Sequence, residues 1–175
     1  SVSEAFIRQT PVQPHLIAET DLFPSPALIR DSITLIPSDA FGYDQLDRIF
    51  VAEYQVDATR IVAFISKRKT PGDAQKLAQG YGDFLVSFGG QRVRADGEDS
   101  PMQIIHIMDS YEVIFTQGAY LAGIHEAADR QPAVDLANRL NQRLKSGEVL
   151  VDRARALAGR MAADPAFRGL FSPGP

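Results

Sequence analysis

Alternating apolar and polar positions dominate the stretch from Tyr111 to Glu126, YEVIFTQGAYLAGIHE. Nearly every second residue is apolar or aromatic, and Gly118 interrupts the run near its middle. A two-residue period is typical of strands, and a glycine between two such runs indicates a tight turn. The stretch therefore predicts two long antiparallel strands at the centre of a sheet.

The same alternation predicts further strands on both sides of this hairpin. The candidate runs are 33–36, 49–56, 60–66, 91–94 and 102–108. In the second of these runs, the expected core face consists of Phe50, Ala52, Tyr54 and Val56. Short turns between consecutive strands favour antiparallel pairing, so we expect an α+β fold built on a twisted antiparallel sheet of about six or seven strands.

Apolar residues at three- and four-residue steps predict amphipathic helices that cover this sheet. The first helix begins at Thr70-Pro71, a good cap followed by a proline suited to the first turn, and ends at Gly89-Gly90. Its apolar stripe consists of Ala74, Leu77, Ala78, Tyr81, Phe84, Leu85 and Phe88. A second helix is expected from about Arg130 to Lys145, where Gly147 would end it, and a further C-terminal helix over 148–163.

The chain divides into three parts: a Pro-rich arm at 1–32, an α+β sandwich domain at 33–146, and a C-terminal helix and tail at 147–175. The prolines of the arm break regular structure, yet the arm keeps more apolar residues than a disordered tail would. Packing along its own domain is the simplest explanation, and ordering on a partner is the alternative. The tail also retains apolar residues, at Phe167, Leu170 and Phe171.

Composition narrows the function classes. The chain has 175 residues, a net charge of -4 and no cysteine. A negative charge argues against a nucleic-acid partner, and the lack of cysteine excludes disulfides, thiolate catalysis and cysteine-ligated metals. No apolar run reaches the length of a membrane span, so we expect no transmembrane segment. The chain starts at Ser1 without Met, as a processed or shortened chain would.

One segment resembles a metallopeptidase helix. His125, Glu126 and Asp129 follow that pattern with Asp in place of the second His. However, His125 is expected to end a strand and Asp129 to begin a helix, which need not bring the two side chains together. No third ligand is apparent, so we expect a hydrogen-bonded structural histidine and no metal.

Other polar groups also favour structural roles. His106 and Met108 lie too close on one strand to ligate a haem iron from opposite sides. The run 66–69, SKRK, has a serine–lysine spacing, but Ser66 closes a strand, so a solvated basic turn is expected. The carboxylates of Asp96, Glu98 and Asp99 lack the glycine and distal Glu of a calcium loop. We therefore expect no catalytic group and no cofactor.

Three motifs together resemble a family of uncharacterised bacterial, mostly exported proteins. These motifs are Ala40-Phe41-Gly42-Tyr43-Asp44, the Thr70-Pro71 helix start, and Gly118 through Glu126, GAYLAGIHE. The resemblance covers about residues 30–146 of the chain. The family has no assigned activity, so the resemblance implies no functional residue.

The order of strands and helices is also similar to the PsbP-like fold, whose members are accessory subunits on the lumenal side of photosystems. The long Pro-rich arm and the helix after residue 147 depart from that fold. Similarity of fold implies function by analogy alone. The resemblance to the PsbP-like fold implies a protein that is periplasmic or otherwise exported and peripheral to a membrane.

These observations lead to two hypotheses. The first is a non-catalytic exported accessory or docking subunit of a larger protein complex, which could be membrane-associated. Its expected partner or ligand contacts are Phe41, Tyr43, Phe167, Leu170 and Phe171. The alternative is a small-molecule or lipid-binding module, with a pocket between the sheet and the first helix near Tyr81, Phe84 and the 41–43 loop.

Overall fold

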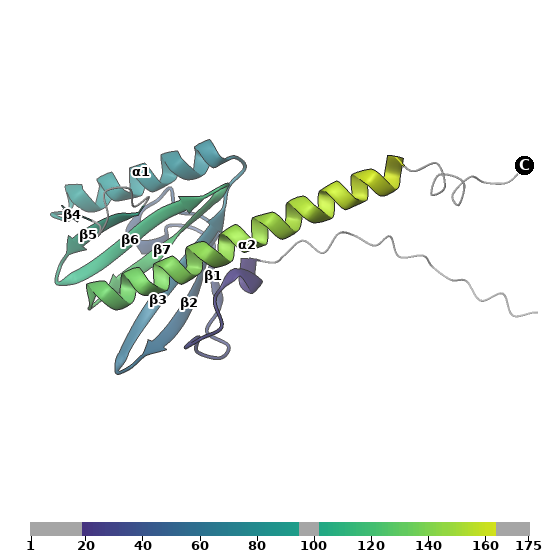
Figure 1. Cartoon of the computed structure of the whole chain (residues 1–175). Coiled ribbons are helices and arrows are strands. Elements are labelled where there is room, and N and C mark those ends of the chain that lie inside the picture. The colour runs from purple at the N-terminus through teal and green to yellow at the C-terminus, as the bar shows by residue number, and fades with distance from the viewer. Residues whose placement is uncertain (1–18, 95–101, 164–175) are drawn as a thin grey trace, which may run out of the picture.

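A seven-stranded antiparallel sheet forms the centre of the protein (Figure 1). The computed structural model describes residues 19–94 and 102–163. The strands follow the order β1-β2-β3-β7-β6-β5-β4 across the sheet. They are β1 (Thr34–Ile36), β2 (Ile49–Val56), β3 (Thr59–Lys67), β4 (Gln91–Val93), β5 (Gln103–Ile107), β6 (Ser110–Gln117) and β7 (Tyr120–Ala127). The predicted α+β fold with an antiparallel sheet of six or seven strands is confirmed.

Two α-helices, α1 (Pro71–Ser87) and α2 (Arg130–Ala163), pack on opposite faces of this sheet. Two short 3-10 helices, η1 (Glu19–Leu22) and η2 (Ala40–Gly42), belong to the loops around it. Alternate residues of the central strands enter one core or the other: Ala63 and Ile65 of β3 face α2, whereas Phe64 faces α1. The central strands are therefore buried on both sides.

Local signals in the sequence set the ends of α1. The Thr70 side chain accepts a hydrogen bond from the backbone N–H of Asp73 at 3.1 Å, and Pro71 occupies the first turn. Gly89, with a φ of +97°, follows the last turn, where glycine tolerates the left-handed backbone. The helix packs against β5, β6 and β7, whereas Ile36 of β1 and Val51 of β2 stay only partly buried on this face.

The opposite face is covered by α2 together with the last part of the N-terminal arm. Helix α2 contributes Ala133, Leu136, Ala137, Leu140 and Leu144 to the core. Leu22 and Phe23 are buried in the same core, and the backbone N–H of Ile29 donates to Glu53 O at 2.8 Å on the edge of β2. From Glu19 onward, the arm thus packs along its own domain.

The helix α2 does not stop at Gly147, as the sequence led us to expect, but continues as one helix of 34 residues. Gly147 is buried, and it has no positive φ, so it does not form the left-handed cap with which glycine usually ends a helix. It follows Leu140 and Leu144 by seven and three residues, on the side of α2 that faces the core. The second and third predicted helices are one continuous element.

We predict that Gly123→Ala destabilises the sheet strongly. A Cβ at this position of β7 would lie 2.0 Å from the backbone oxygen of Val113 and 2.6 Å from the Phe64 ring, so the backbone must move. We expect a loss of about 2–3 kcal/mol in the free energy of unfolding, measured by urea titration.

Gly159→Ala is the matched control, because a Cβ there meets nothing within 4 Å on the exposed helix. This variant should unfold at the same or higher urea concentration than the wild type, because alanine favours a helix by about 1 kcal/mol relative to glycine. Equal stability of the two variants would contradict the close packing of β7 against β6.

Candidate functional site

Aromatic rings fill the space between the sheet and α1. The ring centroid of Phe41 lies 5.3 Å from that of Phe64, and Tyr43 lies 4.9 Å from Phe84. Tyr81 is completely buried between them. Two of the expected contact residues, Phe41 and Tyr43, are therefore half-buried against their own domain. The other three, Phe167, Leu170 and Phe171, lie outside the described residues.

A buried polar cluster lies next to these rings. The Glu112 side chain is only 1% exposed, and its Oε2 accepts from the Tyr81 hydroxyl at 3.2 Å. Its Oε1 accepts from the backbone N–H of Glu126 at 2.9 Å. The same oxygen lies 2.8 Å from Nδ1 of His125, a contact that is an ion pair when the imidazole is protonated. The cluster ties α1, β6 and β7 together through one carboxylate.

Irregular backbone places Glu112 in this position. The pairing of β6 with β7 shifts register between Tyr111 and Val113, and Glu126 opposite has a φ of +48°. Burial raises the pKa of the Tyr81 hydroxyl far above its ordinary value, and the Glu112 carboxylate raises it further. Tyr81 therefore stays protonated and donates to Glu112 throughout the range in which the fold is stable.

The geometry of this cluster favours a structural role. Glu112 is sealed from solvent, and the Phe41 ring stacks on the His125 imidazole with 3.8 Å between centroids. A general acid or base must reach the proton that it transfers on a substrate, which a sealed carboxylate does not. Within residues 19–94 and 102–163, no group of three His, Asp or Glu side chains could hold a metal ion.

The structure separates the other groups considered from the sequence. His106 packs against Tyr111 and faces the side of the sheet opposite to His125. Ser66 is buried and donates to Arg48 O at 2.9 Å, which leaves its hydroxyl no role as a nucleophile. Asp129 precedes α2, and Asp96, Glu98 and Asp99 lie outside the described residues.

Arg68 of the same basic turn is also engaged within the domain. Its guanidinium contacts the Asp47 carboxylate and the hydroxyl of Ser66. The hydrogen bond that Arg68 donates to the Asp47 carboxylate lowers the pKa of that carboxyl below its ordinary value. The basic turn at 66–69 is therefore tied to the loop before β2, as a structural element.

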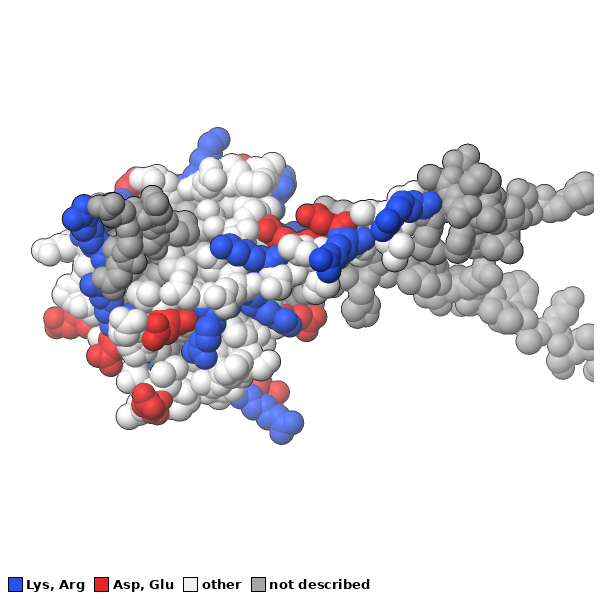
Figure 2. Space-filling view, in the orientation of Figure 1, with Lys and Arg blue, Asp and Glu red and all other residues white. Residues whose placement is uncertain are grey.

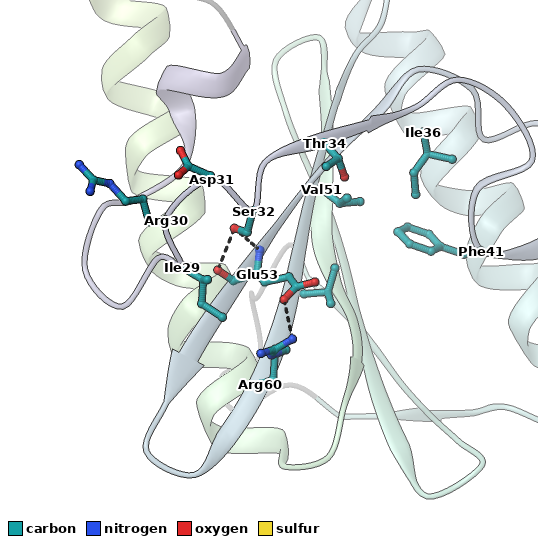
Figure 3. A pocket seen from close by; sticks show the side chains of 11 residues that line it. Ile29, Arg30, Asp31, Ser32, Thr34, Ile36, Phe41, Val51, Glu53 and Arg60 are labelled. Carbon is teal, nitrogen blue, oxygen red and sulfur yellow. Dashed lines mark hydrogen bonds and ion pairs between the residues drawn. The ribbon is translucent and has the colours of Figure 1, made fainter.

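An open groove lies on the part of the sheet that α1 leaves bare (Figure 3). It has a volume of about 510 Å³ and an apolar floor of Ile36, Val51 and Val62. Phe41 stands at one end, and the ion pair of Arg60 with Glu53, 3.0 Å apart, stands at the other. The groove is adjacent to the pocket position expected from the sequence, with Phe41 shared between them.

A second open surface is the outer half of α2. Glu148, just before this half, contacts the sheet by accepting from Gln117 Nε2 at 2.8 Å. Every described side chain of residues 149–160 is exposed, and we call these residues the α2 extension. Leu150 and Leu157 are 56% and 53% exposed. Figure 1 shows this part of the helix projecting beyond the sheet.

Comparison with protein-family models, with curated proteins and with solved structures gives no match for this chain. Within the described residues, neither helix is long and apolar enough to cross a membrane. The two open surfaces, the groove and the α2 extension, are the candidate sites, because the buried cluster is closed to any partner.

We predict that Tyr81→Phe destabilises the protein at neutral pH by about 1–3 kcal/mol, because it removes a donor from a buried carboxylate. Tyr54→Phe, whose hydroxyl donates to the neutral carbonyl of Pro24 at 2.9 Å, should cost about 0.5–1.5 kcal/mol. Chemical unfolding at pH 7 measures both values. A smaller cost at Tyr81 than at Tyr54 would contradict the role assigned to Glu112.

The pKa shift of Tyr81 also predicts a pH dependence. The pKa of the Tyr81 hydroxyl is raised in the folded state above its ordinary value of 10.0, so the folded protein holds this proton more tightly than the unfolded chain does. This difference stabilises the fold fully below pH 10, and the stabilisation is lost as pH rises through the folded pKa. The free energy of unfolding should fall above about pH 10, and it should fall less steeply for Tyr81→Phe than for the wild type.

Proposed function

We propose that the protein is a non-catalytic accessory subunit that docks onto a protein partner through the α2 extension. One observation carries this proposal. The first half of α2 packs on the sheet, whereas its second half projects beyond the sheet with exposed leucines. Most helical stability in proteins comes from packing of an apolar face, and the described side chains of this part of α2 are exposed and lack such packing. A partner would supply it.

The spacing of the exposed side chains supports a helix-in-groove or helix-on-helix contact. Leu150 and Leu157 are seven residues apart, which is two helical turns, so both lie on one face. Ala154 lies between them on the same side and allows close approach. Anchors at such intervals are typical of amphipathic helices that bind a groove on another protein.

The docking element differs from the one expected from the sequence in its location. Phe41 and Tyr43 pack within the domain, whereas Phe167, Leu170 and Phe171 lie outside the described residues. The proposed partner is part of a larger protein complex, and this class of partner includes membrane-bound complexes. The proposed location is outside the cytoplasm. The support for both points is the resemblance of the strand and helix order, as expected from the sequence, to the PsbP-like fold, and it is an analogy alone.

Substitution of the two leucines tests this proposal. We predict that Leu150→Ser with Leu157→Ser abolishes co-purification of a partner from native extract, because it removes about 2–4 kcal/mol of apolar contact. The recovered partner is then purified and titrated against each variant by calorimetry. The double variant should fold normally, since both side chains are exposed in the free protein.

Leu35→Ser is the matched control, because Leu35 is 49% exposed on the edge strand β1 and does not belong to the α2 extension. It should bind the purified partner as the wild type does. If the double variant and the control bind equally, the α2 extension is not the docking element.

A second candidate function is binding of a small molecule or lipid in the groove beside Phe41. The observation that favours it is the volume of about 510 Å³ over an apolar floor, which is in the range of ligand pockets. The charged groups at the rim, Arg60 and Glu53 among them, would orient a ligand that has an apolar body.

We predict that Val62→Glu releases any ligand that co-purifies with the chain, because it places a carboxylate on the floor of the groove. Native mass spectrometry of the purified protein measures the bound mass. Val86→Glu, at an exposed position of α1, is the control and should keep the ligand. A wild-type protein without bound mass, or a ligand retained by Val62→Glu, would reject this function.

A further inference from the structure

The charge of the α2 extension is opposite to that of the rest of the chain. Residues 149–160 contain three basic residues and one acidic residue, Asp152, a net charge of +2. The remaining residues contain fifteen basic and twenty-one acidic residues, a net charge of -6. Figure 2 shows Lys and Arg side chains along the part of α2 that projects from the domain. The protein therefore presents a local basic surface on an acidic molecule.

The basic side chains border the exposed leucines. Arg153 follows Leu150 by three residues, and Arg160 follows Leu157 by three, so each arginine lies beside a leucine on the neighbouring turn. Both arginines are exposed. Glu148, which precedes the extension, points back toward the sheet and contacts Gln117. The acidic residue within the extension is Asp152, which is exposed. The outer face of the helix thus consists of an apolar seam with arginines along one side.

This arrangement disfavours a second copy of the chain as the partner. If two extensions packed through their leucines, Arg153 and Arg160 of each copy would lie near the arginines of the other, and like charges across an interface oppose binding. It also disfavours insertion into a lipid surface. Among the described side chains of the extension, the exposed large apolar ones are Val149, Leu150 and Leu157, which is little for a helix held at a membrane interface.

From this surface we infer the chemistry of the partner: an amphipathic helix whose apolar seam is flanked by Glu or Asp residues. This inference rests on the proposed docking function and deepens it. The leucines would pack into the partner's seam, and the carboxylates would pair with Arg153 and Arg160. Such pairs at the edge of an interface fix orientation and partner choice, and they speed association.

Charge reversal of the two arginines tests the inference. The variant Arg153→Glu with Arg160→Glu is titrated with two synthetic helical peptides that share a leucine seam, one flanked by Glu and one by Lys. The full-length wild type should prefer the Glu peptide, and the variant should bind that peptide about tenfold more weakly and reverse the preference. Binding of the Glu peptide to the wild type should also weaken as salt rises, because exposed charges are screened.

The matched control is Lys69→Glu with Lys76→Glu, which changes the net charge equally at exposed positions near α1. It should bind the Glu peptide as the wild type does. Equal binding of both peptides to the wild type would overturn the inference. So would concentration-dependent dimerisation of the wild type, or stronger binding to vesicles of phosphatidylglycerol and phosphatidylcholine than to the Glu peptide.

The native partner separates this inference from the docking function. If Leu150→Ser with Leu157→Ser abolishes binding of the recovered partner while the arginine variant binds it like the wild type, docking stands and the acidic partner is wrong. If neither variant affects that partner, the docking function itself fails, whatever the peptides show.

Discussion

Burial of the sheet on both faces is the constraint on which the rest of the structure depends. The central strands β3, β7 and β6 send alternate side chains into two separate cores, so each face needs its own cover. Helix α1 covers one face, and α2 with residues 19–29 covers the other. The covers differ in extent: on the α1 face, parts of β1, β2 and β3 stay open and form the floor of the groove. The open surfaces of the protein follow from where these covers end.

The buried Glu112 holds one cover in place. Its carboxylate accepts from Tyr81 of α1 and from the backbone of β7, and so it joins the helix to the centre of the sheet. A buried carboxylate without such partners would be strongly destabilising. The fold can therefore bury Glu112 only because Tyr81 and the backbone of β7 donate hydrogen bonds to it. The stacking of Phe41 on His125 then closes the loop at 40–42 over the cluster and forms the end wall of the groove.

Local signals made most of the fold predictable from the sequence. The alternation in β2, β3, β6 and β7, and the turn at Gly118, depend on neighbouring residues alone, and so does the cap of α1 at Thr70. The errors and omissions concern long-range contacts. Gly147 has the local signature of a helix end, but it is buried on the side of α2 that faces the core, and the helix continues through it. Glu112 reads as an ordinary polar position in a strand, because neither the register shift nor its contact with Tyr81 has a local signal. The contacts of Phe41 with Phe64 and His125 likewise have no local signal in the sequence.

The central functional claim is that the two halves of α2 differ: the first half packs in the core, and the α2 extension binds a partner. Amide hydrogen exchange on the free, full-length protein measures this difference directly. We expect strong protection at 133–147, which packs on the sheet, and weak protection at 149–160, with protection of the second segment rising when the purified partner binds. Equally strong protection of both segments in a free monomer would mean that the chain covers its own extension, and it would contradict the docking function.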